Sequence, residues 1–312
     1  LLRRLVSSGR RDRGRGLPIA PNRDRPADDA PSRRFGPDRD DEPTPAGAPA
    51  ANTHVDSDDE QPEAAPPVTQ PAPPPPPAPQ PPQPDGAPGG ELLFEDRFDS
   101  GAAGDSIWGP KQAAPGSLDY VDSPTFPGRS KAMRNRLEPG DIHSGTSSSR
   151  SELTGSQRFR DGDVRWFRMP VRFNEWSLQS GAWALIWQAH SGSGSPPLAT
   201  YVQSDELLLR LKNGYTEQVF WEWEFELHRW YDIVIGTRFS HGSDGWVEVW
   251  IDGVQQKLRN GQSRMTGATL SPTSEFSYDK LGLYQSSSFS SGARELLHGM
   301  YRVGTTREAV VR

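Results

Sequence analysis

Hydrophobic and polar side chains alternate along much of the chain from residue 91 onward. In residues 165–173 (RWFRMPVRF) every second side chain is apolar, and the same period of two recurs in residues 231–235 (YDIVI) and 246–251 (WVEVWI). A strand points successive side chains to opposite faces, so this period indicates strands with one apolar face. Asp-Gly follows the last of these stretches and favours a tight hairpin turn. The pattern predicts a nearly all-β chain.

Many short strands and few helices over roughly 220 residues favour two antiparallel sheets packed face to face. We therefore predict a β-sandwich of the jelly-roll, concanavalin A-like type. In such a fold each strand has a core face and an outer face, so the parity of a residue along its strand assigns it to one of them. The stretch 295–304 (ELLHGMYRVG) is expected to be the last strand.

The first 90 residues differ in composition from the remainder. Most of the 31 prolines lie there, whereas all ten tryptophans lie beyond them. Residues 71–84 (PAPPPPPAPQPPQP) favour an extended polyproline II spacer. We predict a disordered, Arg/Asp/Pro-rich tail and linker over residues 1–90, followed by a jelly-roll domain over residues 91–312.

Charge and targeting signals restrict the partners. The formal net charge is −6, so no global basic field exists to gather nucleic acid. The chain has no cysteine, so disulfides give no sign of its redox compartment. The opening arginines are followed by no apolar run long enough for a signal peptide or a membrane span. A Pro-rich stalk before a compact domain is nevertheless common in exported and wall-associated proteins. We expect an extracellular or cell-wall location, a monomer, and no nucleic-acid partner.

Polar side chains end a strand that is otherwise hydrophobic, at residues 183–190 (WALIWQAH). Strict parity puts Trp183, Leu185 and Trp187 on the core face. Gln188 and His190 then lie on the outer face, about 6 to 7 Å apart. An amide and an imidazole are therefore expected side by side on the sheet surface.

Two further strands, within residues 149–154 and 276–285, repeat this design. Their outward residues carry a guanidinium, a carboxylate, an amine and phenols: Arg150, Glu152, Tyr278, Lys280 and Tyr284. Gly282 falls on the same face and is expected to leave room above it for a ligand. If the three strands are neighbours in one curved sheet, these groups meet on its concave face.

This set of groups suits β-elimination on a uronic acid sugar. The reaction must neutralise the carboxylate beside C5, remove the C5 proton and protonate the departing oxygen at C4. Arg150 and Gln188 can donate hydrogen bonds to the carboxylate and stabilise the enolate-like intermediate. His190, neutral near pH 7, can take a proton. Tyr284 can donate one, or act as the base if Arg150 and Lys280 lower its pKa.

Three motifs in this order, RSEL, QAH and YDKLGLYQ, resemble the signature strands of jelly-roll polysaccharide lyases. Alginate lyases of this type carry Arg-(Ser/Thr)-Glu-Leu, Gln-(Ile/Val)-His and Tyr-Phe-Lys-Ala-Gly-(Ile/Val)-Tyr-Asn-Gln. The heparin lyase I-like and glucuronan lyase-like groups are related sandwiches. Here Ala189 replaces the usual branched residue and no Asn follows Tyr284, so the chain departs from the alginate lyase pattern. WQAH followed by SGSGSPPLATYV and the ending KLGLYQ are more similar to the heparin lyase I-like group. The resemblance covers residues 91–312.

The resemblance implies a role for each matching position. Arg150 and Gln188 match the residues that neutralise the carboxylate, His190 the base or its helper, and Tyr284 the acid or acid/base. Lys280 matches a substrate-contacting lysine of the YDKLGLYQ motif, and Glu152 is expected to orient Arg150. Two outward-facing residues, Arg168 and Tyr278, are also expected to bind the substrate. An anionic, uronate-containing polysaccharide is the implied substrate.

Two other classes of function remain open. A non-catalytic carbohydrate-binding sandwich would use the same face for recognition. Residues 221–230 (WEWEFELHRW) carry alternating glutamates that would suit a glycoside hydrolase, although the spacing differs from the Glu-x-Asp-x-x-Glu strand of laminarinase-like hydrolases. Trp221 or Trp223 could stack on a sugar there.

Metal ligands and the other histidines give no further signal. No cofactor or catalytic metal is expected, although loop carboxylates could hold a structural Ca²⁺. The histidines outside the motifs are expected in turns or at the surface: His143, His228, His241 and His298.

Overall fold

The computed structural model describes residues 90–312, except for 105–106, 145, 147, 193 and 204–205. The tail expected over residues 1–90 lies outside these residues apart from its last position, so its disorder stays a prediction.

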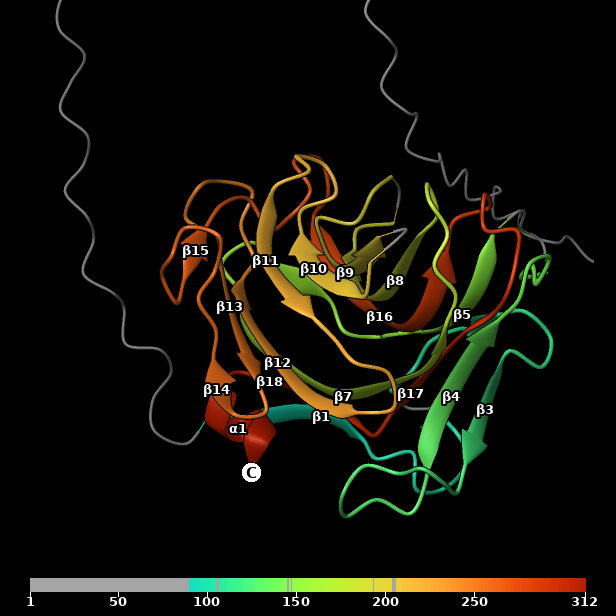
Figure 1. Cartoon of the computed structure of the whole chain (residues 1–312). Helices are drawn as coiled ribbons and strands as arrows, with labels where there is room; N and C mark the ends of the chain where they lie inside the picture. Colours follow the sequence, from blue (N-terminus) through green and yellow to red (C-terminus); the bar gives the residue numbers. More distant parts are fainter. Residues whose placement is uncertain (1–89, 105–106, 145, 147, 193, 204–205) are drawn as a thin grey trace, which may run out of the picture. The chain divides into compact units, whose positions relative to one another are not determined.

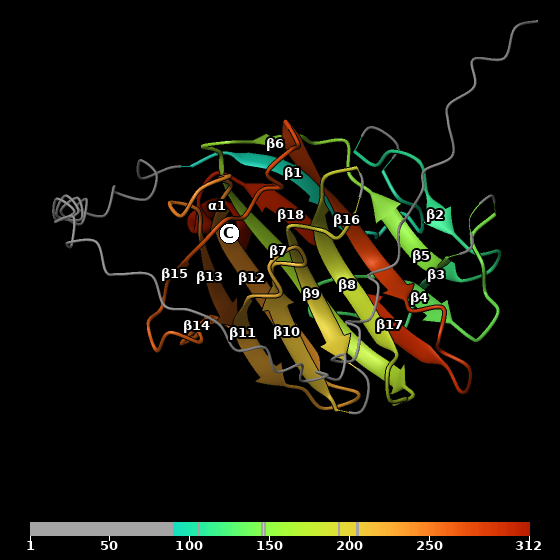
Figure 2. The same cartoon turned by 90° about the horizontal axis from the view of Figure 1, so that it is seen from above.

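Two antiparallel sheets pack against each other within the described residues (Figure 1 and, from above, Figure 2), which confirms the predicted all-β sandwich. In spatial order, the eight-stranded sheet contains β11 (Val219–Glu224), β10 (Leu208–Lys212), β9 (Leu198–Gln203), β8 (Trp183–His190), β16 (Phe276–Gln285), β5 (Ser149–Thr154) and β2 (Gln112–Ala113), with β6 (Phe159–Arg160) paired to β16. The ten-stranded sheet contains β14 (Val254–Gln255), β13 (Trp246–Ile251), β12 (Trp230–Arg238), β7 (Val164–Trp176), β17 (Arg294–His298), β4 (Ala132–Leu137) and β3 (Leu118–Val121), together with β15 (Met265–Thr266), β1 (Leu92–Asp96) and β18 (Tyr301–Gly304).

The core lies between the two sheets and follows the period of two. On β7, Phe167, Met169, Val171 and Phe173 are fully buried in the main hydrophobic cluster. The facing residues from the eight-stranded sheet also belong to that cluster: Leu153, Trp187, Ala189, Leu209, Leu211, Leu281 and Leu283. The alternate residues of the eight-stranded sheet therefore point away from the core, toward the face that carries the predicted site.

The β13–β14 hairpin turns through Asp252 and Gly253, both with positive φ (52° and 80°). This geometry is that of the tight turn expected for Asp-Gly. The C-terminal stretch differs from its prediction, because 295–304 contains parts of two strands, β17 and β18, and a short helix follows, α1 (Arg307–Val311). That helix helps to cover a second apolar cluster on the outer face of the ten-stranded sheet: Trp166, Val234, Trp246, Trp250 and Val310.

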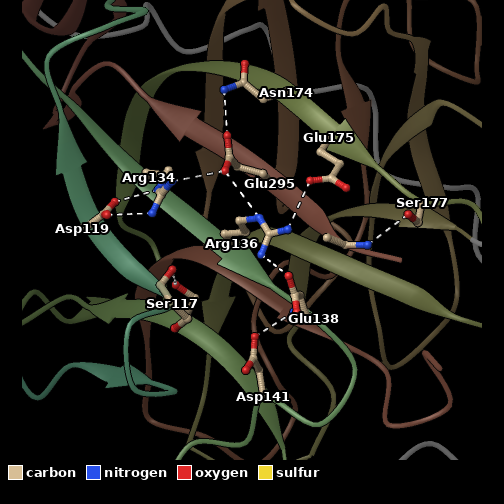
Figure 3. A network of polar contacts seen from close by, with 12 residues as sticks. Ser117, Asp119, Arg134, Arg136, Glu138, Asp141, Asn174, Glu175, Ser177 and Glu295 are labelled. Atoms are coloured by element: carbon tan, nitrogen blue, oxygen red, sulfur yellow. Dashed lines mark hydrogen bonds and ion pairs between the residues drawn. The ribbon is translucent and has the colours of Figure 1, made fainter. Parts of the chain in front are cut away.

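Charged side chains pair with one another elsewhere on the ten-stranded sheet (Figure 3). Arg134 of β4 makes a two-pronged contact with Asp119 of β3, with both N···O distances 2.8 Å. Arg136 contacts Glu138, Glu175 and Glu295. Exposed pairs of this kind contribute about 0–1 kcal/mol each. We regard this network as a link between β3, β4, β7 and β17.

Candidate active site

A β-bulge in β8 decides which of its side chains reach the outer face. Where β8 pairs with β9, the register shifts between Leu185 and Trp187. Where β8 pairs with β16, the register shifts opposite residues 281–284 of β16. Ala184 and Ile186 before the bulge and Trp187 and Ala189 after it all pack in the core. Strict parity was therefore right for Gln188 and His190 but wrong for Trp183, because a bulge adds one residue and reverses the alternation.

Gln188, Glu152 and Arg150 form a buried polar chain across β8, β16 and β5. Gln188 Nε2 donates to Glu152 Oε1 at 2.5 Å, and Glu152 Oε2 lies 4.0 Å from Arg150 Nη1. The three side chains are 1%, 1% and 3% exposed. Since the amide nitrogen of Gln188 must face the carboxylate, Glu152 fixes the orientation of this amide, and it lies beside the guanidinium as a counter-charge.

Gln112 of β2 joins this chain to Lys280, although nothing in the sequence pattern marked it. Its Oε1 accepts hydrogen bonds from Arg150 Nη1 and from Lys280 Nζ, each at 3.0 Å. A neutral amide oxygen thus lies between two cations. The register explains the meeting, because β2 pairs with β5 through Gln112 and Glu152, and β16 pairs with β5 on the other side.

His190 is held as a neutral imidazole with a defined tautomer. The Gly192 backbone N–H donates to His190 Nδ1 at 2.8 Å, and the Tyr278 hydroxyl lies 3.3 Å from the same nitrogen. Burial, assisted by the charges of Lys280 and Arg150, lowers the pKa of His190 to about 3. Because Nδ1 accepts a backbone N–H, the single proton of the neutral ring is on Nε2.

The Tyr284 ring lies between the Arg150 guanidinium and the Trp183 indole. The Arg150 guanidinium carbon is 4.2 Å from the centre of the Tyr284 ring. On the other side Trp183 meets the ring edge to face, with centroids 4.9 Å apart and an interplanar angle of 85°. Tyr284 is only partly buried, whereas Lys280 on the same strand is 2% exposed. The phenol is thus more accessible than the charged groups around it.

Gly282 does not provide room for a ligand as expected. A Cβ at this position would lie 2.1 Å from the Ser151 carbonyl oxygen, and the residue has φ +143°. Glycine is required there because the backbone of β5 approaches closely. Asn135 supports the same place from the core side, where its Nδ2 donates to the Ser151 carbonyl at 2.6 Å.

Two more sequence expectations are corrected by the placement of their residues. Arg168 lies on β7 in the ten-stranded sheet, paired with Asp232 at 2.8 and 2.9 Å, and does not join the other expected site residues. His298, expected in a turn or at the surface, is fully buried on β17, and burial lowers its pKa to about 3.

The glutamate-rich strand β11 lies at the edge of the eight-stranded sheet, separated from β8 by β9 and β10, and Trp221, Glu222 and Trp223 line a pocket there. Trp221 belongs to the main hydrophobic cluster, with Trp223 packed against it. Glu222 is bound by Arg210 and Arg259, with N···O distances of 3.1 and 2.8 Å.

The structure thus brings eight residues together on the outer face of the eight-stranded sheet, and we call them the polar cluster: Gln112, Arg150, Glu152, Gln188, His190, Tyr278, Lys280 and Tyr284. With Arg150 and Lys280 positive, Glu152 negative and His190 neutral, its charge is +1. This local charge is opposite in sign to the net charge of −6 of the whole chain.

Within the described residues, no group of three or more His, Cys, Asp or Glu side chains could hold a metal ion. No helix there is long and apolar enough to cross a membrane.

The family of the chain follows from its sequence as a whole. Residues 98–308 match the polysaccharide lyase family. Because this match spans well over half of the 312 residues, the chain belongs to the polysaccharide lyase family, and the resemblance inferred from the three motifs is confirmed. None of the curated proteins matches the sequence.

Solved structures share the fold at low identity. An endo-β-1,4-glucuronan lyase from the fungus Trichoderma reesei is 16% identical with a TM-score of 0.51, over 69% of this chain and 96% of that one. A glycoside hydrolase family 131 catalytic domain from Coprinopsis cinerea is 10% identical with a TM-score of 0.51, over 69% and 94%. An alginate lyase from Corynebacterium sp. is 16% identical with a TM-score of 0.44, over 61% and 82%. At these identities the likeness to the first two structures concerns the fold alone.

Proposed function

We propose that the protein cleaves a uronate-containing anionic polysaccharide by β-elimination at the polar cluster. The observation that carries this proposal is the convergence of two buried cations, Arg150 and Lys280, on one neutral oxygen of Gln112. A carboxylate is a stronger acceptor for such donors than an amide oxygen. A uronate carboxylate placed there would also bring the charge of the cluster from +1 to zero.

The carboxylate partners would act mainly on the intermediate. Removing the C5 proton spreads negative charge onto the carboxylate oxygens, and fixed donors stabilise that charge without reorganisation. Arg150 and Lys280 supply positive charge, and Gln188 can donate the second N–H of its amide, since Glu152 accepts the first. Because these groups are buried, their interactions with the charge are screened less than in water.

Proton transfer is assigned to Tyr284 and a supporting donor role to His190. With Nδ1 occupied by the Gly192 N–H, the imidazole can present only an N–H at Nε2, so it is a hydrogen-bond donor and not a proton acceptor. Tyr284 remains to take the C5 proton and to return one to the departing C4 oxygen. Arg150, close to its ring, stabilises negative charge on the phenolic oxygen.

A hydrolytic reaction receives less support from this geometry. Glycoside hydrolysis usually needs two carboxyl groups about 5–10 Å apart beside the scissile bond. Glu152 is the one carboxylate of the polar cluster, and Gln188 and Arg150 already bind it. A purely binding role stays the second candidate, since the same cations would hold an anionic glycan without turnover.

The test is incubation of the protein with alginate, polyglucuronate, heparin, hyaluronan and pectate, followed by ultraviolet absorbance. Only elimination creates the conjugated C4–C5 double bond that absorbs, whereas hydrolysis or binding does not. The expected extracellular or cell-wall location and the monomeric state belong to the same proposal.

A further inference from the structure

An aromatic row leaves the polar cluster and crosses the outer face of the eight-stranded sheet. It starts at Tyr284 on β16, passes to Trp183 on β8 and continues to Tyr201 on β9. The ring centroids are 4.9 Å apart in the first step and 6.5 Å in the second. Lys212 on β10 ends the row, with its amine 4.1 Å from the Tyr201 ring centre. The strands are neighbours in this order, so the row advances one strand at a time.

The β8 bulge is the reason that the row exists. Without the extra residue, strict alternation from Trp187 would turn Trp183 into the core, where Ala184 and Ile186 now lie. The bulge instead places a partly buried indole beside the expected catalytic phenol. Bulges commonly re-aim a side chain next to an active site.

We propose that Trp183 and Tyr201 form a sugar-binding platform for the part of the glycan chain that extends beyond the bond being cleaved. This inference rests on the proposed function, because it assumes the same uronate glycan. An indole combines a large apolar face with a polar N–H, which suits the C–H face and the hydroxyls of a pyranose ring. Neighbouring strands lie about 4.8 Å apart, close to the length of one sugar unit. A chain running across the strands would therefore place successive sugars over β16, β8 and β9.

The far end of the row carries an amine that is ion-paired with a carboxylate. Lys212 lies against Tyr201 and pairs with Glu217 of the following turn, so the cation and the phenol are held together. A uronate carboxylate over β10 would bind this amine by displacing Glu217 from it. The platform thus predicts a preference for oligosaccharides long enough to reach past the polar cluster.

A positioning role is the competing explanation for Trp183, because it touches Tyr284. The two roles differ in kinetics. A residue that only orients the phenol would change kcat by the same factor for every chain length. A platform changes KM and kcat/KM, and its effect grows as the chain becomes long enough to cover β8 and β9.

The experiment measures kcat and KM for a size series of uronate oligosaccharides with wild type, Trp183→Ala and Trp183→Phe. We expect Trp183→Ala to lower kcat/KM on the long chains by roughly tenfold, equivalent to about 1.4 kcal/mol, with kcat nearly unchanged. The shortest cleaved substrate should lose little, and Trp183→Phe should retain part of the platform. Trp230→Ala is the matched control, since it removes a partly buried indole from β12 of the other sheet and should change kcat/KM little.

Calorimetric titration of long uronate oligosaccharides into Tyr284→Phe, with and without Trp183→Ala, tests the platform without turnover. We expect the added substitution to weaken binding roughly tenfold. Equal affinity of the two proteins would overturn the inference, as would a loss of kcat that is independent of chain length. The proposed function fails differently, namely when wild type binds the glycan but produces no ultraviolet-absorbing product.

Discussion

Replacing His190 by Gln or by Asn separates a donor role from a base role. The side-chain nitrogen of Gln reaches the place of Nε2 and can donate there, whereas the side-chain oxygen of Asn takes the place of Nδ1 and can accept from the Gly192 N–H. Each variant therefore keeps one half of the imidazole's hydrogen bonding.

The two variants should show opposite effects on activity and stability. His190→Asn loses the donor at Nε2, and a hydrogen bond to a charged group contributes about 1.5–3 kcal/mol, so kcat/KM should fall roughly 10- to 150-fold. His190→Gln should stay within about tenfold of wild type, because the donor is kept. It loses the hydrogen bond from the Gly192 N–H, and because Gly192 is exposed and water can replace the acceptor, the cost is that of one ordinary hydrogen bond, about 0.5–1.5 kcal/mol of folding stability. The more active variant is thus expected to be the less stable one.

Initial rates on the best uronate substrate and thermal unfolding of each variant provide the measurements. If His190 were the base, both variants would lose the 10²- to 10⁴-fold typical of general base catalysis, and Gln would rescue nothing. The pH profile gives a second readout. With the pKa of His190 lowered to about 3, kcat/KM should show no acid limb near pH 6.5 that depends on this residue. Such a limb, abolished in both variants, would refute the donor assignment.

Three further outcomes are expected. Gln112→Glu should raise KM roughly tenfold or more, because the new carboxylate competes with the substrate for Arg150 and Lys280. Gln112→Leu should not raise KM. Equal KM values for the two variants would contradict the role of these cations. Because the pKa values of His190 and His298 are lowered, the unfolded chain binds more protons at these two sites between pH 6.5 and 3. The folded state therefore loses stability as the pH falls, and each histidine contributes on the order of 1.4 kcal/mol per pH unit. His298→Leu should remove one share of this slope in denaturant titrations, and an unchanged slope would show that the group is not buried neutral. Arg168→Ala should lower the melting temperature by breaking its pair with Asp232 but leave kcat/KM within about twofold, and a larger kinetic loss would place a substrate contact on the ten-stranded sheet.

Strand alternation predicted the fold well wherever pairing is regular. In β7 the buried residues Phe167, Met169, Val171 and Phe173 are those expected from a period of two. The same reasoning failed in the first half of β8, because no local sequence signal marks the bulge that turns Trp183 outward. A bulge depends on how two strands meet, which a pattern along one strand does not contain.

Residues of the candidate site could be predicted only where they lie in one of the three motifs. Parity gave the outward direction of Arg168 but not its sheet, since either sheet of a sandwich has an outer face. Gln112 was missed because it lies on a strand of two residues with no alternation to interpret. His298 was misplaced because a polar residue at the end of an apolar strand resembles a surface position. These contacts join residues far apart in sequence, so only the assembled sheets reveal them.

Formation of the C4–C5 double bond is the most direct test of the central claim that the polar cluster performs β-elimination. Wild type and Tyr284→Phe should be compared on the uronate polysaccharide that wild type cleaves fastest, with ultraviolet absorbance as the readout. The phenylalanine ring preserves packing against Trp183 and Arg150, so only the proton-transferring hydroxyl is lost. We expect turnover to fall by about 10²- to 10⁴-fold with binding largely kept. If Tyr284→Phe retained more than about a tenth of wild-type turnover, less than ~1.4 kcal/mol would depend on the hydroxyl, and the account of this site would be contradicted.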